Sequence, residues 1–477
     1  MANFTGFLKH GGNYFIASLA TRSLAFISIP IYTRLLSTED YGIVSVFMGV
    51  SGFLVSLMAL SADRSVSRYF FDQKSELDFK RFVGTSSLLA TGFFIINSFL
   101  VFYFAEDFGN LVGLSKNVVH LIIPFSMVSI IGLTFEQIYG PLKRSKEIAI
   151  YSVISVFLGF ALSVAFLLVM KNDKFYGQIW GQIAAGFVMI FFWIRLIKPY
   201  FVFSFDKSYI KYIFTYSVPL IPYALSSVII EQFSKIAIGS SQGMSEAGFY
   251  NLALSISSIV NIVVIVTHQA WNPYYFEYMI SKNYTQLDND FIKIFKITIL
   301  VAFGVASFGE ELGLLLAKKE FSGALYLVPI FTIGYIFSQL SFAYVRNFGY
   351  TKKTHYMTLT ILTGGISNVV LNVFFIKSFG ELGAAISFVM SYIIMAVLAW
   401  LINTHSVKLH ATPFKNLFLP LVFTIPFYIV LYFVLGIESF FGSLLIKVFF
   451  FCVLTFIFFW TDRKEILIVI NNILKSK

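Results

Sequence analysis

The stretch YFIASLATRSLAFISIPIYTRLL (residues 14–36) is apolar for more than twenty residues, yet it carries Arg22 near its middle. A helix needs about 20 mostly apolar residues to cross a hydrocarbon core of roughly 30 Å, and runs of this length recur along the whole chain. Hydrophobic residues make up 58% of the 477 residues and charged residues only 12%, which leaves too little polar surface for a soluble globule. The sequence therefore predicts an all-α integral membrane protein.

The apolar runs divide the chain into about fourteen transmembrane helices. The first is longer than the apolar region of a signal peptide, so we expect it to be retained. The predicted spans are 13–36, 41–62, 83–105, 117–139, 149–170, 176–197, 213–237, 245–268, 293–317, 322–345, 356–376, 380–403, 416–436 and 442–461.

Lys and Arg residues concentrate in alternate connections between these spans, including 63–82, 140–148 and 346–355. Cytoplasmic connections of membrane proteins attract basic residues, so the pattern predicts that both termini face the cytoplasm. The net charge of +11 is then mainly an orientation signal, and nucleic-acid binding is a poor explanation for basic residues spread singly over short loops.

No connection carries a motif typical of an enzyme. The longest, around 63–82 and 269–292, show no paired carboxylates, metal ligands or Gly-rich phosphate loop. The single cysteine, Cys452, allows neither an intrachain disulfide nor a cysteine metal site. We therefore expect no catalytic residues, no metal and no cofactor.

The chain shows signs of an internal repeat. Gly42 and Gly248 each follow an acidic residue by two positions at the start of a predicted helix, and Gly177 and Gly383 lie at the same offset of 206 residues. Basic turns at Lys143 and Lys352 are 209 residues apart. Chance similarity between hydrophobic helices is the alternative. The repeat predicts two six-helix lobes around a central cavity, residues 1–210 and 211–410, followed by two further helices and a tail, residues 411–477.

Three segments resemble the polysaccharide-repeat-unit flippases (Wzx type) of the multidrug, oligosaccharidyl-lipid and polysaccharide export (MOP) superfamily. They are IPIYTRLLSTEDYGIVSV near the N-terminus, QAWNPYYFEYM (269–279) and SNVVLNVFFIKSFGELGAAISFVMSY (367–392). The last is similar to the family's "N, then FG, then GAA" signature through Asn372, Phe379 to Gly380, and Gly383 to Ala385. Two positions depart from the family pattern: Ser234-Lys235 replaces Asp-Arg, and Lys377-Ser378 lacks the usual proline.

The resemblance implies transfer of an undecaprenyl-pyrophosphate-linked oligosaccharide from the cytoplasmic to the periplasmic leaflet of a bacterial inner membrane, for O-antigen, capsule or exopolysaccharide synthesis. The implied partners are the lipid-linked oligosaccharide, the bilayer and other polysaccharide assembly proteins. Such a substrate needs a cavity with cations for its phosphates and hydrogen-bonding groups for its sugars, while the lipid tail stays between helices.

Three basic residues are candidates for this phosphate contact. Arg22 lies roughly 13 Å by helical rise from the cytoplasmic start of its span, too deep to snorkel, so we expect it to face the interior. There it would bind a phosphate, or pair with a carboxylate or helix-end carbonyls in a structural role. Arg34, near the far end of the span, and Lys235 are the other candidates. A snorkelled anchor is the alternative for Arg34.

Embedded acids are candidates for ion coupling. Glu231 precedes Lys235 by four residues, which also fits a local ion pair. Glu310 and Glu311 lie inside the ninth span and could carry a proton or cation, or face solvent at a loosened helix end. Hydration and capping also explain four residues near predicted cytoplasmic helix ends: Asp63, Arg64, Glu136 and His268.

Three function classes remain open. A flippase of lipid-linked oligosaccharides expects a cationic cavity and short loops. A multidrug or small-cation antiporter of the same superfamily expects acids to dominate the cavity, which Glu231, Glu310 and Glu311 keep possible. A membrane polymerase or glycosyltransferase expects a catalytic loop, which the sequence lacks.

Overall fold

The computed structural model describes residues 20–21, 23–24, 26–59, 62–434 and 440–475. Within these ranges all regular secondary structure is helical. A chain inside a bilayer must satisfy its backbone hydrogen bonds internally, which explains why a sequence this apolar forms helices. The predicted all-α membrane fold is confirmed.

The described part of the chain contains eleven helices long and apolar enough to cross a membrane. One of these runs, Thr354–Val407, contains two predicted spans, and the shorter apolar helix Gly442–Phe458 covers the last. The first predicted span, 13–36, is described from residue 20 onward, without residues 22 and 25. The named α-helices are α2 (Thr38–Met58), α3 (Ala62–Tyr69), α4 (Glu76–Tyr103), α5 (Ala105–Val112), α6 (Lys116–His120), α7 (Ile122–Tyr139), α8 (Ser145–Val169), α9 (Phe175–Ile197), α10 (Lys207–Ser217), α11 (Ile221–Ser241), α12 (Met244–Ser281), α13 (Tyr284–Leu316), α14 (Val328–Tyr350), α15 (Thr354–Ile402), α16 (Phe414–Val434) and α17 (Phe440–Lys475).

Local sequence signals set several helix ends. Ser37 caps α2 in a capping box with Asp40, and Ser75 caps α4 by accepting a hydrogen bond from the Asp78 amide. Gly113 ends α5 in the left-handed conformation. Between α10 and α11, Pro219 lies in a short 3-10 turn, Val218–Leu220, as expected where a proline removes a backbone donor.

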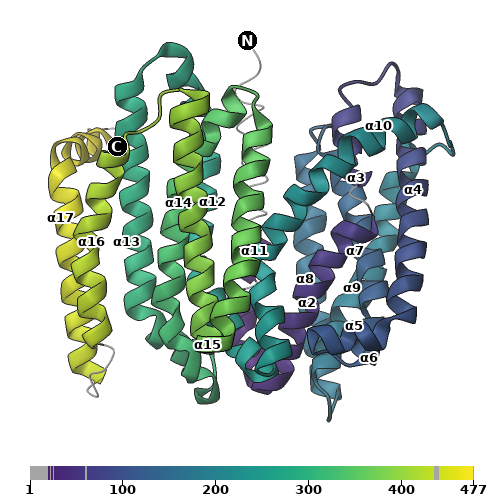
Figure 1. Cartoon of the computed structure of the whole chain (residues 1–477), viewed down its shortest axis with the longest axis horizontal. Helices are drawn as coiled ribbons and strands as arrows, with labels where there is room; N and C mark the ends of the chain where they lie inside the picture. The colour runs from purple at the N-terminus through teal and green to yellow at the C-terminus, as the bar shows by residue number, and fades with distance from the viewer. Residues whose placement is uncertain (1–19, 22, 25, 60–61, 435–439, 476–477) are drawn as a thin grey trace. The chain divides into compact units, whose positions relative to one another are not determined.

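The chain divides into two compact units. Unit 1 comprises Met1–Leu252, Leu314–Ala324 and Ile361–Ser391. Its core lies among α2, α3, α4, α7, α8, α9 and α10, and includes the fully buried Phe82 and Ile138. Figure 1 shows α10 lying across the upper end of this bundle.

Unit 2 comprises Ala253–Gly313, Leu325–Thr360 and Tyr392–Lys477. The last two named helices pack beside α13: Phe451 of α17 lies against Gly304, and Phe427 of α16 meets Phe303 edge to face with ring centroids 5.8 Å apart. Figure 1 shows α13, α16 and α17 running side by side.

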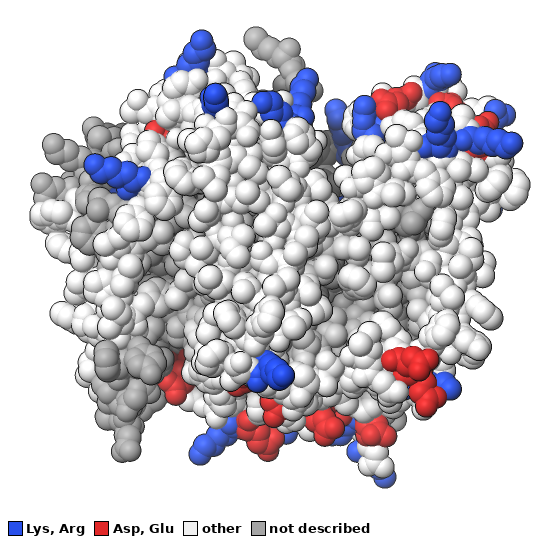
Figure 2. Space-filling view, viewed as in Figure 1, with Lys and Arg blue, Asp and Glu red and all other residues white. Residues whose placement is uncertain are grey.

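Charge is distributed unevenly along unit 1. Around α3, α4 and α10, Lys and Arg predominate at the end where α10 lies, and acidic side chains gather at the opposite end near α5 (Figure 2). The end where α10 lies carries the basic connections that the sequence assigns to the cytoplasm. The distribution is that of a membrane protein with one basic face.

The positions that indicate a repeat share local structure. Lys143 and Lys352 both have positive φ, 58° and 60°, in their turns. Gly177 packs against the end of α8 at Phe166 and Leu167, and Gly383 against the equivalent helix end at Phe375.

Gly42 and Gly248 contact each other directly. A Cβ atom at Gly42 would lie 1.6 Å from the Met244 carbonyl oxygen, and one at Gly248 would lie 2.5 Å from that of Thr38. The two equivalent helix starts therefore cross at these glycines. The lobe boundaries 1–210, 211–410 and 411–477 stay a prediction.

Candidate substrate site

Unit 1 contains a cavity of about 580 Å³ between α2, α3, α7, α8 and α9. This volume lies within the range of small-molecule sites, roughly 300–1,000 Å³. Apolar side chains such as Val55, Phe125 and Trp193 form much of the wall. The polar lining residues are Ser56, Arg64, Ser129, Glu136, Ser152, Ser155 and Gln182.

Arg64 supplies the positive charge of this cavity. It belongs to the first turns of α3, and among the residues whose side chains are described none forms a hydrogen bond or ion pair with it. The next arginine, Arg68, is instead paired with Asp72 at 3.1 Å. A guanidinium offers five donors in a planar fork that matches a phosphate or carboxylate. The Arg64 side chain is therefore available to an anion that enters the cavity.

Glu136 places a carboxylate on another wall of the cavity. Its Oε1 accepts a hydrogen bond of 3.4 Å from the Ser152 hydroxyl, joining α7 to α8. The Glu136 side chain otherwise remains accessible within the cavity. A carboxylate can accept several hydrogen bonds, so Glu136 can bind hydroxyl or amide groups of a sugar, or carry a proton.

Lys235 lies in a separate buried cluster of unit 1 and is not among the residues that line the cavity. Its Nζ donates to Asn251 Oδ1 at 3.1 Å, and the charge of Glu231 acts on it. The adjacent Ser234 Oγ accepts a 3.1 Å hydrogen bond from Asn372. These contacts join α11 to α12 and α15.

The family signature around Asn372 has a structural explanation. The Asn372 amide group also donates to Asn368, at 2.8 Å to its backbone oxygen. Gly380, with φ 61° and ψ −137°, breaks α15 into two helices, as the two predicted spans require. Gln242 then donates to the Ile376 carbonyl at 3.1 Å, which satisfies one backbone group at this break.

The structure describes two of the three predicted phosphate contacts, Arg34 and Lys235, and their hydrogen bonds go to different partners. Arg22 lies outside the described residues. Arg34 is exposed, and its guanidinium donates to the backbone oxygens of Pro30 at 3.2 Å and Leu315 at 3.4 Å. Those contacts fix a helix end. The substrate-binding roles of Arg22, Arg34 and Lys235 stay predictions.

Glu310 and Glu311 meet a buried lysine of unit 2. The Lys447 side chain is 1% exposed, and its Nζ lies 2.7 Å from Glu311 Oε1 and 3.8 Å from Glu310 Oε2. This pairing fastens α17 to α13. Coupling of an ion by Glu231, Glu310 or Glu311 stays a prediction.

A second buried cation in unit 2 is Arg346. Position 346 was predicted to lie in a connection, but α14 continues past the predicted span to Tyr350 and buries Arg346, which is 7% exposed. Its guanidinium lies 4.4 Å from the Trp271 ring centroid and 5.8 Å from that of Tyr275. Each cation–π contact is worth about 0.5–2 kcal/mol, which does not replace a missing hydrogen bond to a buried charge.

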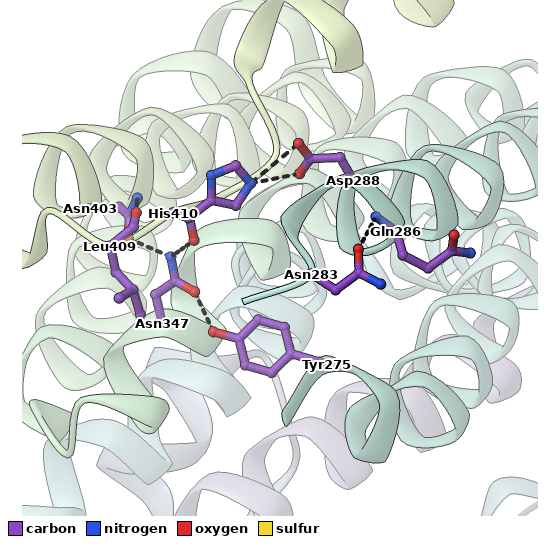
Figure 3. Close-up of polar contacts among 8 residues, drawn as sticks. All are labelled: Tyr275, Asn283, Gln286, Asp288, Asn347, Asn403, Leu409 and His410. Carbon is purple, nitrogen blue, oxygen red and sulfur yellow. Dashed lines mark hydrogen bonds and ion pairs between the residues drawn. The ribbon is translucent and has the colours of Figure 1, made fainter. Parts of the chain in front are cut away.

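Next to Arg346, Asn347 is the centre of a polar network (Figure 3). It accepts a hydrogen bond from the Tyr275 hydroxyl and donates to Asn403 Oδ1 at 2.8 Å and to the His410 carbonyl at 2.9 Å. The His410 ring lies 3.1 Å from Asp288 Oδ1. The network joins α12, α13 and α14 to the segment that leads into α16.

Comparison with known proteins identifies the family. The family model described as polysaccharide biosynthesis protein matches residues 7–279, more than half of the chain. The chain belongs to this family. A succinoglycan biosynthesis transport protein, ExoT, of Rhizobium meliloti is 26% identical over 259 residues, which cover 52% of this chain. The match spans only 49% of that relative.

The fold of this polysaccharide biosynthesis protein is that of the MOP transporters. It is similar to the lipid II flippase MurJ in an inward closed conformation, with a TM-score of 0.69, 15% identity, and coverage of 94% of this chain and 99% of that one. It is also similar to an inward-facing multidrug MATE transporter, with a TM-score of 0.65, 14% identity and coverage of 81% and 94%. The predicted resemblance to a polysaccharide biosynthesis family is confirmed by the family match, and the fold is similar to that of transporters of the MOP superfamily.

Two cations of this family member were missed as site candidates from sequence. Arg64 and Arg346 lie near the ends of apolar runs, where hydration is the simplest explanation for a charge. The sequence did not indicate how far the helices extend: α14 continues beyond its apolar run, and α3 is a short additional helix after α2. Only the packing of neighbouring helices decides whether such an end residue is hydrated or enclosed.

Proposed function

We propose that this protein moves an undecaprenyl-pyrophosphate-linked oligosaccharide from the cytoplasmic to the periplasmic leaflet. The main support is that Arg64 lines the cavity of about 580 Å³ in unit 1 and has no partner among the described residues. A pyrophosphate entering this cavity would gain charge-assisted hydrogen bonds in a partly dehydrated site, where they are strong. The family and the fold support transport of a lipid-linked substrate.

The position of the cavity fits loading from the cytoplasmic leaflet. Glu136 and Ser152 lie close to the turn between α7 and α8, which carries Lys143 and Arg144. This is the end of unit 1 that the distribution of basic residues assigns to the cytoplasm. In this arrangement Arg64 holds the pyrophosphate, while Glu136 and the cavity serines accept or donate hydrogen bonds to the first sugars.

Release to the periplasm requires the opposite end of unit 1 to open. There the crossing of α2 and α12 at Gly42 and Gly248 brings backbone against backbone. Small residues allow such a close approach without a bulky interlock, so the contact can separate and reform. We propose alternating access in which this crossing opens when the cavity end closes. Arg22, Arg34 and Lys235 are further proposed contacts along the route.

A cellular assay tests the proposal. Deleting the gene in its own host should make lipid-linked repeat units accumulate on the cytoplasmic leaflet, and the wild-type gene should relieve this. We expect Arg64→Gln to fail and Arg64→Lys to restore part of the activity, because it keeps charge but loses the planar fork. Arg195→Gln, an exposed change at the end of α9, is the matched control. Absence of accumulation on deletion would contradict the proposal.

One observation favours a second function, ion-coupled drug or cation antiport. Glu136 is an accessible carboxylate in the same cavity, and it could alternate between a proton and a cationic solute. Efflux of a cationic dye driven by a proton gradient, lost in Glu136→Gln but retained in Arg64→Gln, would support antiport. The reverse dependence, on Arg64 with an anionic lipid substrate, would support the flippase.

A further inference from the structure

The Arg346 guanidinium of unit 2 is buried and incompletely satisfied. Its Nε donates to His268 Nε2 at 3.2 Å, and its Nη2 donates to the His268 carbonyl at 2.9 Å. Its Nη1 has no hydrogen-bond partner among the described residues, although the side chain belongs to a residue only 7% exposed. Burying a charged donor without a hydrogen-bond partner is unfavourable in free energy, so a bound acceptor at Nη1 would stabilise this arrangement.

The surrounding residues do not supply a counter-charge. His268 accepts a hydrogen bond at Nε2, so that nitrogen carries a lone pair and the ring is neutral. The acids of the nearby α13 start are engaged elsewhere: Asp288 with His410, and Asp290 with Tyr278 at 2.9 Å. No carboxylate in the described part of unit 2 pairs with Arg346. The Arg346 charge is therefore not neutralised by an ion pair within the described part of unit 2.

A second unsatisfied donor lies beside the first. Trp271 is 6% exposed, and its indole Nε1 has no hydrogen-bond partner among the described residues. The Trp271 ring contacts the Arg346 guanidinium, with 4.4 Å from Cζ to the ring centroid. Trp271 also lines a groove of about 370 Å³ between α12 and α13, together with Tyr274, Lys293 and the carboxylate of Asp290. The groove brings open space to the Trp271 side chain, next to the two buried donors.

The geometry points to an oxyanion site in unit 2, at which Arg346 Nη1 and Trp271 Nε1 bind a phosphate group. Arginine and a neutral N–H donor together suit a tetrahedral oxyanion, which accepts several hydrogen bonds at once. The phosphate can come from a glycerophospholipid of the membrane or from a soluble pyrophosphate. The site goes beyond the proposed transport activity and does not depend on it, because no residue of the unit 1 cavity contributes.

Binding to the purified full-length protein in detergent tests the site. One arm titrates inorganic pyrophosphate by isothermal calorimetry. The other measures retention of phosphatidylglycerol by native mass spectrometry, with a phosphate-free galactolipid for comparison. Binding of pyrophosphate alone assigns a soluble source, and preferential retention of phosphatidylglycerol assigns a lipid source. Either result supports the site if it depends on the two donors.

The decisive variant is Trp271→Phe, which keeps a ring under Arg346 but removes the indole donor. We expect binding about tenfold weaker, the loss of one hydrogen bond worth about 1.4 kcal/mol. Arg346→Lys should weaken binding further, and the exposed Arg195→Gln should leave it unchanged. Wild-type protein that binds neither probe, or equal affinity in wild type and a folded Trp271→Phe variant, would overturn the site.

Discussion

Replacing Lys447 by methionine tests how α17 is held to α13. In the native protein the Lys447 ammonium is buried and lies 2.7 Å from Glu311, whose side chain is 15% exposed. Removing the lysine leaves the Glu311 charge without its partner in a poorly hydrated place. Breaking such a pair costs about 3–5 kcal/mol. We therefore expect Lys447→Met to lower the free energy of unfolding by about 3 kcal/mol or more.

Two companion variants isolate the charge effect. Glu310 is 47% exposed and lies 3.8 Å from the lysine, so Glu310→Gln should cost less than about 1 kcal/mol. The double variant Lys447→Met with Glu311→Met removes both charges and should recover most of the lost stability, because an apolar pair avoids the desolvation penalty. Chemical denaturation of the purified protein in detergent measures all three.

A stability of Lys447→Met within about 0.5 kcal/mol of wild type, the range of an ordinary surface change, would contradict a large cost of the unpaired Glu311 charge. The double variant also separates structure from coupling at Glu311. A folded double variant that still transports assigns a structural role to the pair. A folded double variant that does not transport supports the predicted ion coupling.

Three further predictions concern packing and turns in the two units. Gly42→Ala would place a Cβ atom 1.6 Å from the Met244 carbonyl oxygen and should lower the free energy of unfolding by about 3 kcal/mol or more. Gly92→Ala, with open space around it, should be neutral or stabilise the protein by up to about 1 kcal/mol in the same denaturation assay. Lys352→Gly should stabilise by roughly 1 kcal/mol, since Lys352 has φ 60°; a loss of stability would contradict this. Asn372→Ala should destabilise by about 2 kcal/mol because it removes the hydrogen bonds to Ser234 and Asn368, and Asn97→Ala, with a single 2.8 Å bond to Phe93, should cost less.

The helices were predictable from sequence because the bilayer imposes their length and apolar character. The break between two of them at Gly380 was also predictable, since the apolar run there is too long for one crossing and contains a glycine that adopts positive φ. The sequence indicated Gly42 as part of an internal repeat. Its direct contact with Gly248 could not be derived, because sequence periodicity does not specify which helices cross.

The candidate site was less predictable than the fold. Depth within an apolar run singled out Arg22 and Glu311, but depth does not reveal partners: Glu311 meets Lys447, which lies far away in sequence. Arg64 and Arg346 lie near the ends of apolar runs and looked hydrated. Their surroundings are set by α7, α8 and α9 for the first and by α12 for the second. Tertiary packing therefore decides which charges are structural and which face a cavity.

We propose that Arg64 binds the pyrophosphate of a lipid-linked oligosaccharide during its passage across the membrane. The most direct measurement is translocation of a synthetic polyprenyl-pyrophosphate-linked sugar in proteoliposomes, with wild type, Arg64→Gln and the exposed control Arg195→Gln at equal incorporation. We expect Arg64→Gln to lower the translocation rate about tenfold or more, because it loses a charge-assisted hydrogen bond worth at least about 1.4 kcal/mol, and we expect Arg195→Gln to match wild type. Equal rates in all three proteins would contradict it.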